Sequence, residues 1–321
     1  MSQLQVQLAH TTTFTENLYY MTHSFHHETL PLHSTASNTK FEIDVWRYNH
    51  PDATKTVYLQ GGIHGIELTG IPVVHEFIKE IEHHQLAYNF ICVPLSNPMG
   101  LDSQIMGVQT GYNNIHTNQQ NCWNWNRITN LKDEPSQEGN WIRTLLDLAE
   151  PADIILDLHT AGVETVPHIY YHENDKEYAD GLGVPHILAW NTPSYSFADT
   201  HHQLGKIALT FELSSSRGVR SEWVEESVVY LRRFFGMLPK AEGSRTWQVE
   251  SQLKKWYSPE GGVLCWHIDA GDSVSEGDVI ATLYTRRGSI KLESPYTGVL
   301  QIKNPTHAPH ERQELAKFLV G

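Results

Sequence analysis

The chain has 321 residues, of which 40% are hydrophobic and 19% charged, and its formal net charge is −14 at pH 7. This length predicts more than one domain, and the negative charge argues against nucleic acid or an anionic membrane surface as a partner, because both are bound by positive charge. No segment approaches the ~18–20 consecutive apolar residues of a membrane span, no secretory signal pattern begins the chain, and three scattered cysteines favour a reducing compartment, so we expect a cytoplasmic protein.

The first third of the chain predicts a sheet with a covering helix. Residues 1–40 lack periodicity and predict an N-terminal lead-in with at most one short strand. Residues 41–48 alternate apolar and polar side chains, which is typical of a half-buried strand. A second strand over residues 54–62 stops at two glycines, residues 68–81 have helical spacing, and residues 89–95 form another buried strand. This order predicts an α/β fold.

The middle of the chain continues that pattern after a long excursion. Residues 96–138 are rich in Asn, Gln, Gly and Trp, and an excursion of this length is usually functional or disordered; the aromatic side chains favour order. The elements predicted after it are helices over residues 141–150 and 221–238 and strands over residues 152–158, 168–172, 185–190 and 206–213. We therefore predict a mixed central sheet with flanking helices.

The last part of the chain has a different character. A polar linker at residues 240–245 precedes a segment in which Gly and Asp mark turns every eight to ten residues, without a helical pattern. These features are typical of a small all-β module. We therefore predict one domain over residues 1–240, with residues 1–40 as its lead-in, and a β module over residues 246–321.

Two predicted strands end next to residues of the kinds that bind metals. His64 and Glu67 follow the two glycines, and His159 follows the apolar run of residues 153–158. The His-x-x-acid pattern alone carries little weight, because the composition predicts about two chance matches and the sequence holds two. Strand ends are, however, the usual place for α/β active sites. Two imidazoles and one carboxylate are a known ligand set for catalytic zinc, which leaves one position open for water.

Two further segments offer residues for catalysis and substrate binding. Glu212 ends an apolar strand and would serve as the general base; a surface glutamate at a strand exit is the alternative. Asn126 and Arg127 close the long excursion, and a guanidinium can hold a substrate carboxylate through two hydrogen bonds. The alternative is a structural arginine stacked on Trp123 or Trp125.

Five motifs, GGIHGIE, SNPMG, NWNR, DLHT and TFEL, occur in an order and spacing that resemble the succinylglutamate desuccinylase/aspartoacylase family within the zinc carboxypeptidase superfamily. The similarity covers roughly residues 41–240. It implies a zinc carboxypeptidase-like fold and an N-acyl amino acid or peptide-like substrate. The implied roles are one Zn²⁺ bound by His64, Glu67 and His159, Glu212 as general base and then acid, and Asn126 and Arg127 at the substrate carboxylate.

The sequence departs from the family pattern at two places. Family members commonly place an oxyanion-stabilising arginine about eight residues before the arginine of the Asn-Arg pair, where this chain has Gln119, followed by Gln120. Asn124-Trp125 replaces the usual Asp-Leu. A neutral amide at Gln119 would stabilise a developing alkoxide less than a charge does. We expect Arg217 to take over part of this role, the alternative being a solvated loop arginine.

The C-terminal segment is similar to the barrel-sandwich modules of biotinyl and lipoyl carriers, through AGDSVSEGDVIATL and SPYTGVL. A carrier presents its lysine at the tip of an exposed hairpin. Here the only lysine near the expected turn is Lys291, which lies two residues beyond it within an alternating stretch. We therefore expect no covalent cofactor.

The leading functional hypothesis is a zinc-dependent amidohydrolase that removes an acyl group from an N-acyl amino acid or a related small amide carrying a carboxylate. A zinc carboxypeptidase acting on peptides is an alternative, because Arg127 serves both equally well. A catalytically silent metal-binding protein is another, favoured by Gln119 and opposed by Glu212, since binding alone needs no base. A homo-oligomer is compatible with all three.

Overall fold

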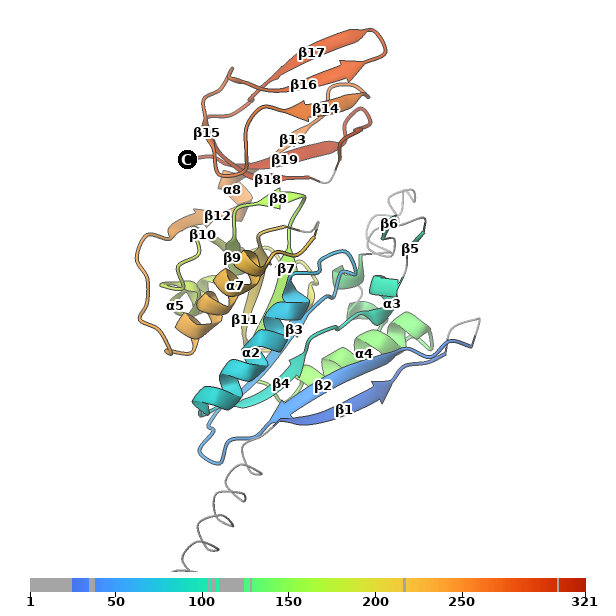
Figure 1. The fold of residues 1–321 in the computed structure, drawn as a ribbon, viewed down its shortest axis with the longest axis vertical. Coiled ribbons are helices and arrows are strands. Elements are labelled where there is room, and N and C mark those ends of the chain that lie inside the picture. Colours follow the sequence, from blue (N-terminus) through green and yellow to red (C-terminus); the bar gives the residue numbers. More distant parts are fainter. Residues whose placement is uncertain are drawn as a thin grey trace, which may run out of the picture.

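The structure is a computed structural model that describes residues 25–34, 38–102, 104–105, 108–109, 124–127, 129–215, 218–304 and 306–321. It consists of a large mixed sheet with helices and a C-terminal part built from antiparallel strands (Figure 1). The predicted fold class, an α/β domain followed by a small β module, is thereby confirmed.

The central sheet has nine strands in the order β1-β2-β4-β3-β7-β11-β9-β10-β12. Its middle strands β4, β3, β7 and β11 are parallel, whereas β2 and β9 join this group in antiparallel fashion. The carboxyl ends of the four parallel strands therefore lie at the same edge of the sheet. The strands are β1 (His26–Pro31), β2 (Glu42–Tyr48), β3 (Thr56–Gly61), β4 (Asn89–Val93), β7 (Ile154–Thr160), β9 (His168–Tyr171), β10 (His186–Ala189), β11 (Ile207–Leu213) and β12 (Arg245–Gln248).

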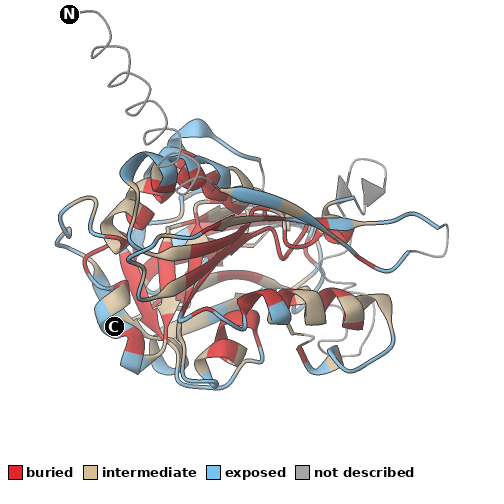
Figure 2. Ribbon diagram, turned by 90° about the horizontal axis from the view of Figure 1, so that it is seen from below, coloured by how far each residue is buried: buried red, intermediate tan, exposed pale blue. Residues whose placement is uncertain are grey.

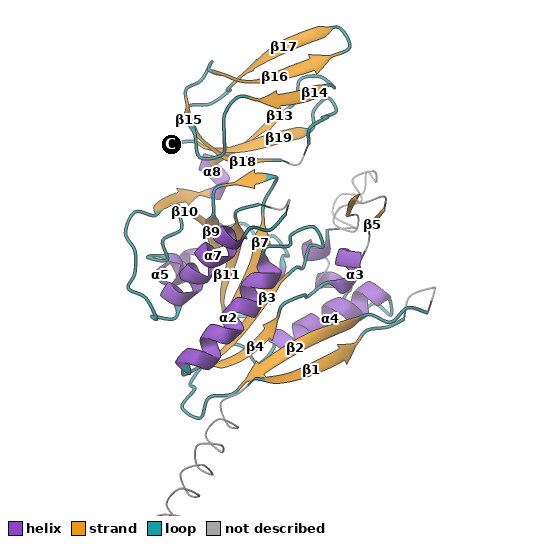
Figure 3. Cartoon of the chain, viewed as in Figure 1, coloured by secondary structure: helices purple, strands orange, loops and turns teal. Residues whose placement is uncertain are grey.

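Helices cover both faces of this sheet (Figure 3). On one face α2 (Gly70–His84) and α7 (Ser221–Phe234) pack together on a hydrophobic core. On the other face α4 (Gln137–Ala149) and α6 (Phe197–His202) bury a second core. The strands between them are largely buried (Figure 2), as the apolar runs predict for parallel strands covered on both faces.

The predicted helix over residues 141–150 begins earlier than expected, at Gln137. The reason is a cap: the Ser136 hydroxyl accepts a hydrogen bond from the Gly139 backbone amide, which satisfies one of the free N–H groups at the helix start. Within the long excursion, the described residues include α3 (Pro98–Asp102) and the 3₁₀ turns η1 (Trp125–Arg127) and η2 (Thr129–Leu131).

The remaining elements of the first part are short. They are β5 (Gln104–Ile105), β6 (Val108–Gln109), β8 (Glu164–Thr165), η3 (Glu173–Asp175), α5 (Lys176–Ala179) and α8 (Val249–Gln252). Among the helices in the described ranges, none combines the length and apolarity that crossing a membrane requires.

The C-terminal module consists of two antiparallel sheets around their own core. One sheet has the order β13-β19-β18-β15 and the other the order β14-β16-β17. Their strands are β13 (Leu253–Tyr257), β14 (Val263–Trp266), β15 (Ser273–Val274), β16 (Val279–Thr285), β17 (Gly288–Glu293), β18 (Gly298–Lys303) and β19 (Glu314–Leu319).

The module is fixed to the large sheet close to the end of β7. The short strand β8, four residues after β7, pairs with β18, and the Lys303 ammonium contacts the Glu164 carboxylate at 2.7 Å. Gly162 has φ +64°, and a Cβ at this position would lie 2.1 Å from the Lys303 carbonyl oxygen, so only glycine allows this close approach. Figure 1 shows the module stacked on this end of the sheet.

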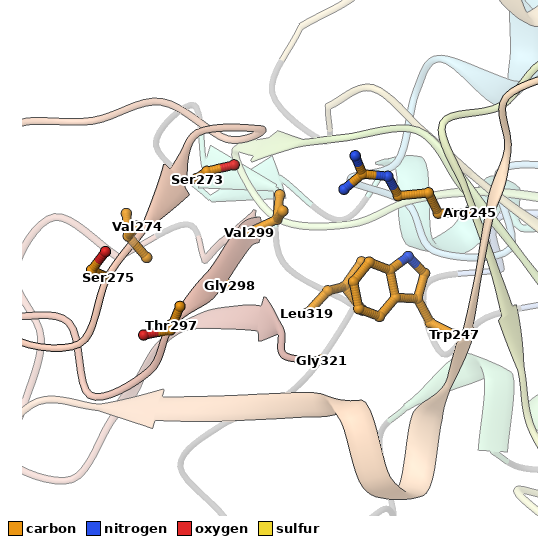
Figure 4. Close-up of a pocket in the computed structure, with 10 residues that line it drawn as sticks. All are labelled: Arg245, Trp247, Ser273, Val274, Ser275, Thr297, Gly298, Val299, Leu319 and Gly321. Atoms are coloured by element: carbon orange, nitrogen blue, oxygen red, sulfur yellow. The ribbon is translucent and has the colours of Figure 1, made fainter.

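A groove of about 350 Å³ lies between the large sheet and the C-terminal module (Figure 4). Arg245 and Trp247 of β12 form one wall, and residues of the module, among them Leu319, form the other. The groove contains none of the residues that the sequence predicts for the site, so it is separate from the chemistry described next.

Candidate metal centre and active site

Tight backbone packing places His64 directly beyond the end of β3. Gly62 adopts φ +70°, and Gly65 lies so close to α3 that an added Cβ would be 2.0 Å from the carbonyl carbon of Gly100. The Glu67 amide donates a 3.0 Å hydrogen bond to the His64 carbonyl oxygen, which closes a turn and brings both side chains to the same place. The glycines of the motif therefore serve this turn.

The three predicted metal ligands converge. His64 Nδ1 lies 2.9 Å from Glu67 Oε1, and His159 Nδ1 lies 3.0 Å from Glu67 Oε2. All three side chains are buried, and one ligand atom from each lies within 4.8 Å of the others. No other such group occurs in the part of the chain that the structure describes.

The nitrogens of the two imidazoles that face away from Glu67 have partners of their own. His64 Nε2 lies 3.0 Å from Asn124 Oδ1, and His159 Nε2 lies 2.9 Å from Asp157 Oδ2. These contacts leave Nδ1 of each ring for a metal ion and fix the orientation of the rings, as outer partners of metal-binding histidines do.

The Asp157 carboxylate is itself held inside the sheet. The Gln60 side-chain amide donates a 2.9 Å hydrogen bond to Asp157 Oδ1, and the Tyr58 hydroxyl donates one of 2.9 Å to Gln60 Oε1. All three side chains are fully buried. A rigid chain of polar groups thus runs from the sheet interior to His159.

The electrostatics of the cluster suit a cation. Burial opposes the ionised form of Glu67, but the charges and hydrogen bonds of His64 and His159 outweigh it and lower the Glu67 pKa to about 2. Burial also opposes the charged form of His159, yet Asp157 and Glu67 outweigh it and raise the His159 pKa. A metal ion would replace this proton as the positive charge of the site. Four-coordinate zinc with bonds of ~2.0–2.2 Å suits ligand atoms about 3 Å apart.

Glu212 lies beside this cluster on the neighbouring strand. It pairs directly with His159 across β11 and β7, so the two side chains leave the sheet on the same face. The residue as a whole is partly accessible, but its Oε2 is buried and has no hydrogen-bond partner among the described residues. Burial raises the Glu212 pKa to about 7, which is suitable for a group that takes and returns a proton near neutral pH.

The raised pKa predicts how metal-free protein responds to pH. A raised folded-state pKa favours the folded state below the unfolded value of 4.5, and this contribution is lost as pH rises through about 7. Glu212→Gln should therefore increase the free energy of unfolding relative to wild type at pH 8, by on the order of 3 kcal/mol. Denaturant titrations at pH 4 and pH 8 measure the difference. An equal difference at both pH values would contradict the buried, ionisable carboxyl.

The predicted substrate-binding residues lie on η1, next to the ligands. The Asn126 side-chain amide nitrogen is 3.2 Å from His159 Nε2, and its Oδ1 accepts a 2.7 Å hydrogen bond from the Phe197 amide at the start of α6. Arg127 NH1 donates a 2.6 Å hydrogen bond to the Asn126 carbonyl. Asn126 thus contacts a predicted metal ligand, and Arg127 follows it in the chain; their roles toward a substrate stay predictions. Gln119 and Arg217 lie outside the described residues.

Three contributors have no predicted role in the sequence. Asp157 and Asn124 hold the imidazoles, and the Thr160 amide donates a 2.9 Å hydrogen bond to Glu67 Oε2. The position of Asp157 beside His159 could have been predicted from the sequence, because Asp157 lies two residues before His159 on the same strand and so shares its face. The other two depend on contacts across the fold.

Comparisons with known proteins bear on this site and fold. The family model for the succinylglutamate desuccinylase/aspartoacylase catalytic domain matches residues 53–235, more than half of the chain. This span includes every residue of the His64, Glu67, His159 and Glu212 cluster. No curated protein matches the chain.

Solved structures share the fold over nearly the whole chain. A putative succinylglutamate desuccinylase/aspartoacylase family protein from Shewanella amazonensis matches with a TM-score of 0.77 and 20% identity, covering 92% of this chain and 98% of that chain. A similar protein from Shewanella frigidimarina gives 0.76 and 17%, over 93% and 98%. The ectoine utilization protein EutE (DoeB) from Ruegeria pomeroyi, in a product-bound structure, gives 0.73 and 18%, over 93% and 96%. At these identities the likeness concerns the fold, C-terminal part included.

Proposed function

Because this chain belongs to the succinylglutamate desuccinylase/aspartoacylase family of hydrolases, we propose that it is a zinc-dependent amidohydrolase that removes the acyl group of an N-acyl amino acid. One observation carries the proposal. Three buried side chains that can bind a metal lie together, one on β7 and two on the loop after β3. A carboxyl with a raised pKa lies beside them on β11, the strand next to β7.

Each residue has a distinct task in this reaction. A zinc ion held by His64, Glu67 and His159 would polarise the scissile carbonyl and lower the pKa of the attacking water. Glu212 takes the proton from that water and hands it to the leaving amine. Its Oε2, which has no hydrogen-bond partner among the described residues, is suited to this transfer.

Substrate binding is assigned to η1. Arg127 would bind the carboxylate of the amino-acid part through its guanidinium, and Asn126 lies between it and His159. The partner we propose is therefore a small molecule with a carboxylate. Gln119 and Arg217 remain our candidates for the oxyanion side of the site.

A substrate panel tests the proposal. Zinc-loaded protein is expected to hydrolyse at least one member of a set of N-acetyl and N-succinyl amino acids, with N-succinylglutamate included because of the family's name, and to leave short unblocked peptides intact. Release of the free amine is the measurement. Cleavage of peptides alone would replace the proposal by a carboxypeptidase, and full zinc occupancy without turnover would indicate a binding protein.

A further inference from the structure

A histidine without a role in the proposed reaction, His168, lies beside the proposed base. His168 on β9 pairs directly with Glu212 on β11, and Glu212 pairs directly with His159 on β7. Side chains in directly paired positions leave the sheet on the same face, and in an antiparallel pair their Cβ atoms lie ~4.5–5.5 Å apart. His159, Glu212 and His168 therefore form one row across three neighbouring strands, with Glu212 in the middle.

His168 and Glu212 each have one buried polar atom without a partner. The His168 side chain is 1% exposed, and neither its Nε2 nor Glu212 Oε2 forms a hydrogen bond with any residue that the structure describes. Buried polar atoms of this kind are costly and rare. Because these two belong to directly opposite residues, a small turn of the Glu212 side chain or one bridging water is enough to join them.

The rest of the His168 ring is held in place. Its Nδ1 lies 2.9 Å from Gln301 Nε2 and 2.9 Å from the Val166 carbonyl oxygen. The Tyr170 ring packs against the imidazole edge to face, with 5.0 Å between the ring centroids. These contacts fix the plane of the imidazole and leave Nε2 as its free end.

The contacts of Gln301 indicate which nitrogen of His168 carries the proton. Gln301 Oε1 lies 2.6 Å from His186 Nδ1, and Gln301 Nε2 donates a 2.8 Å hydrogen bond to the Val166 carbonyl oxygen, so the amide nitrogen is the atom that faces His168. An amide nitrogen can only donate, so His168 Nδ1 accepts and the neutral ring carries its proton on Nε2. Burial lowers the His168 pKa to about 3, which keeps the ring neutral near pH 7.

We propose that His168 is a positioning residue for Glu212: its Nε2–H donates a hydrogen bond, directly or through one water, to the carboxylate and holds it toward the metal centre. This inference rests on the proposed function. A carboxylate offers about four lone-pair sites, so one such bond leaves sites free to take the proton from the attacking water. The bond fixes the side chain of the base in the orientation that the reaction needs.

Two substitutions of His168 separate this role from a structural one. The side-chain amide nitrogen of asparagine can take the place of Nδ1, and that of glutamine the place of Nε2. His168→Asn therefore keeps the contact with Gln301 and loses the donor to Glu212, whereas His168→Gln does the reverse. We expect His168→Asn to lower kcat about 10- to 100-fold, the range for a lost hydrogen bond to a charged group, with KM and zinc content unchanged. His168→Gln should stay within a few-fold of wild-type kcat.

His186→Asn is the matched control. His186 pairs with His168 across β10 and β9 and contacts the other end of the Gln301 amide, but it lies one strand further from Glu212. Its substitution should leave kcat at the wild-type value. A larger loss of kcat in His168→Gln than in His168→Asn, or an equal loss in His186→Asn, would overturn the inference, because these outcomes are expected if the contacts of Gln301 serve the fold alone.

A measurement without turnover keeps the test independent of the proposed function. The His168 Nε2 proton is observed by NMR of zinc-loaded protein with ¹⁵N-labelled histidine, and its signal is assigned by its absence from the His168→Gln spectrum. Glu212→Met removes the acceptor and should move this signal upfield and speed its exchange with water. Glu225→Met, at an exposed position of α7, should change neither.

The two measurements fail separately. An unmoved signal in Glu212→Met would overturn the inference even if the wild-type protein hydrolyses a substrate of the panel. A moved signal in a protein that hydrolyses no substrate would support the contact between His168 and Glu212 and contradict the proposed function.

Discussion

Glu212→Gln is expected to lower kcat by about 10²–10⁴-fold, the usual contribution of a general acid–base group, while KM changes little. Glutamine keeps the shape of the side chain on β11 and its place beside His159, but it cannot take a proton. The metal ligands are untouched, so zinc content should stay at one per chain. Steady-state kinetics on the best substrate of the panel, with metal analysis of the same samples, measure both.

The control for this variant is Glu225→Gln, which makes the same chemical change at an exposed position of α7. It should retain wild-type kcat. A Glu212→Gln enzyme with full zinc and a kcat within a few-fold of wild type would show that another group transfers the proton, and the mechanism proposed for this site would be wrong.

The fold could be predicted from the sequence wherever the hydrophobic pattern within one element shows which of its side chains are buried. The alternation in residues 41–48 corresponds to β2, whose inward side chains are buried, and the apolar run before His159 corresponds to the fully buried β7. The short strand β8 has no such signal, because two residues, Glu164 and Thr165, show no period. It exists because Gly162 lets the chain approach β18 closely.

Some residues of the site could likewise be predicted from local sequence patterns, whereas others depend on contacts between distant segments. His64, His159 and Glu212 could be predicted to converge, because they follow parallel strands and the carboxyl ends of such strands share one edge of the sheet. Asn124 could not, because it contacts His64 from a position sixty residues away in the sequence.

His64→Ala is expected to weaken zinc binding at least about a hundredfold and to lower activity in proportion at limiting zinc. Structural zinc sites with four ligands bind with ~10–16 kcal/mol, so one ligand contributes about 3 kcal/mol. His64 lies on the loop after β3 rather than in a strand, so its removal should disturb the core less than loss of His159. Zinc affinity by competition with a chelator is the direct measurement.

The control is His75→Ala, a histidine exposed on α2 and outside the cluster, which should retain zinc and activity. Wild-type enzyme stripped by a chelator should lose activity and regain it with zinc, whereas excess zinc should restore the His64→Ala enzyme only in part, because Glu67 then has one imidazole neighbour instead of two. Unchanged zinc affinity in His64→Ala would show that the ion is bound elsewhere, and the convergence of the three side chains would then need a different explanation, such as a proton-sharing network around Glu67.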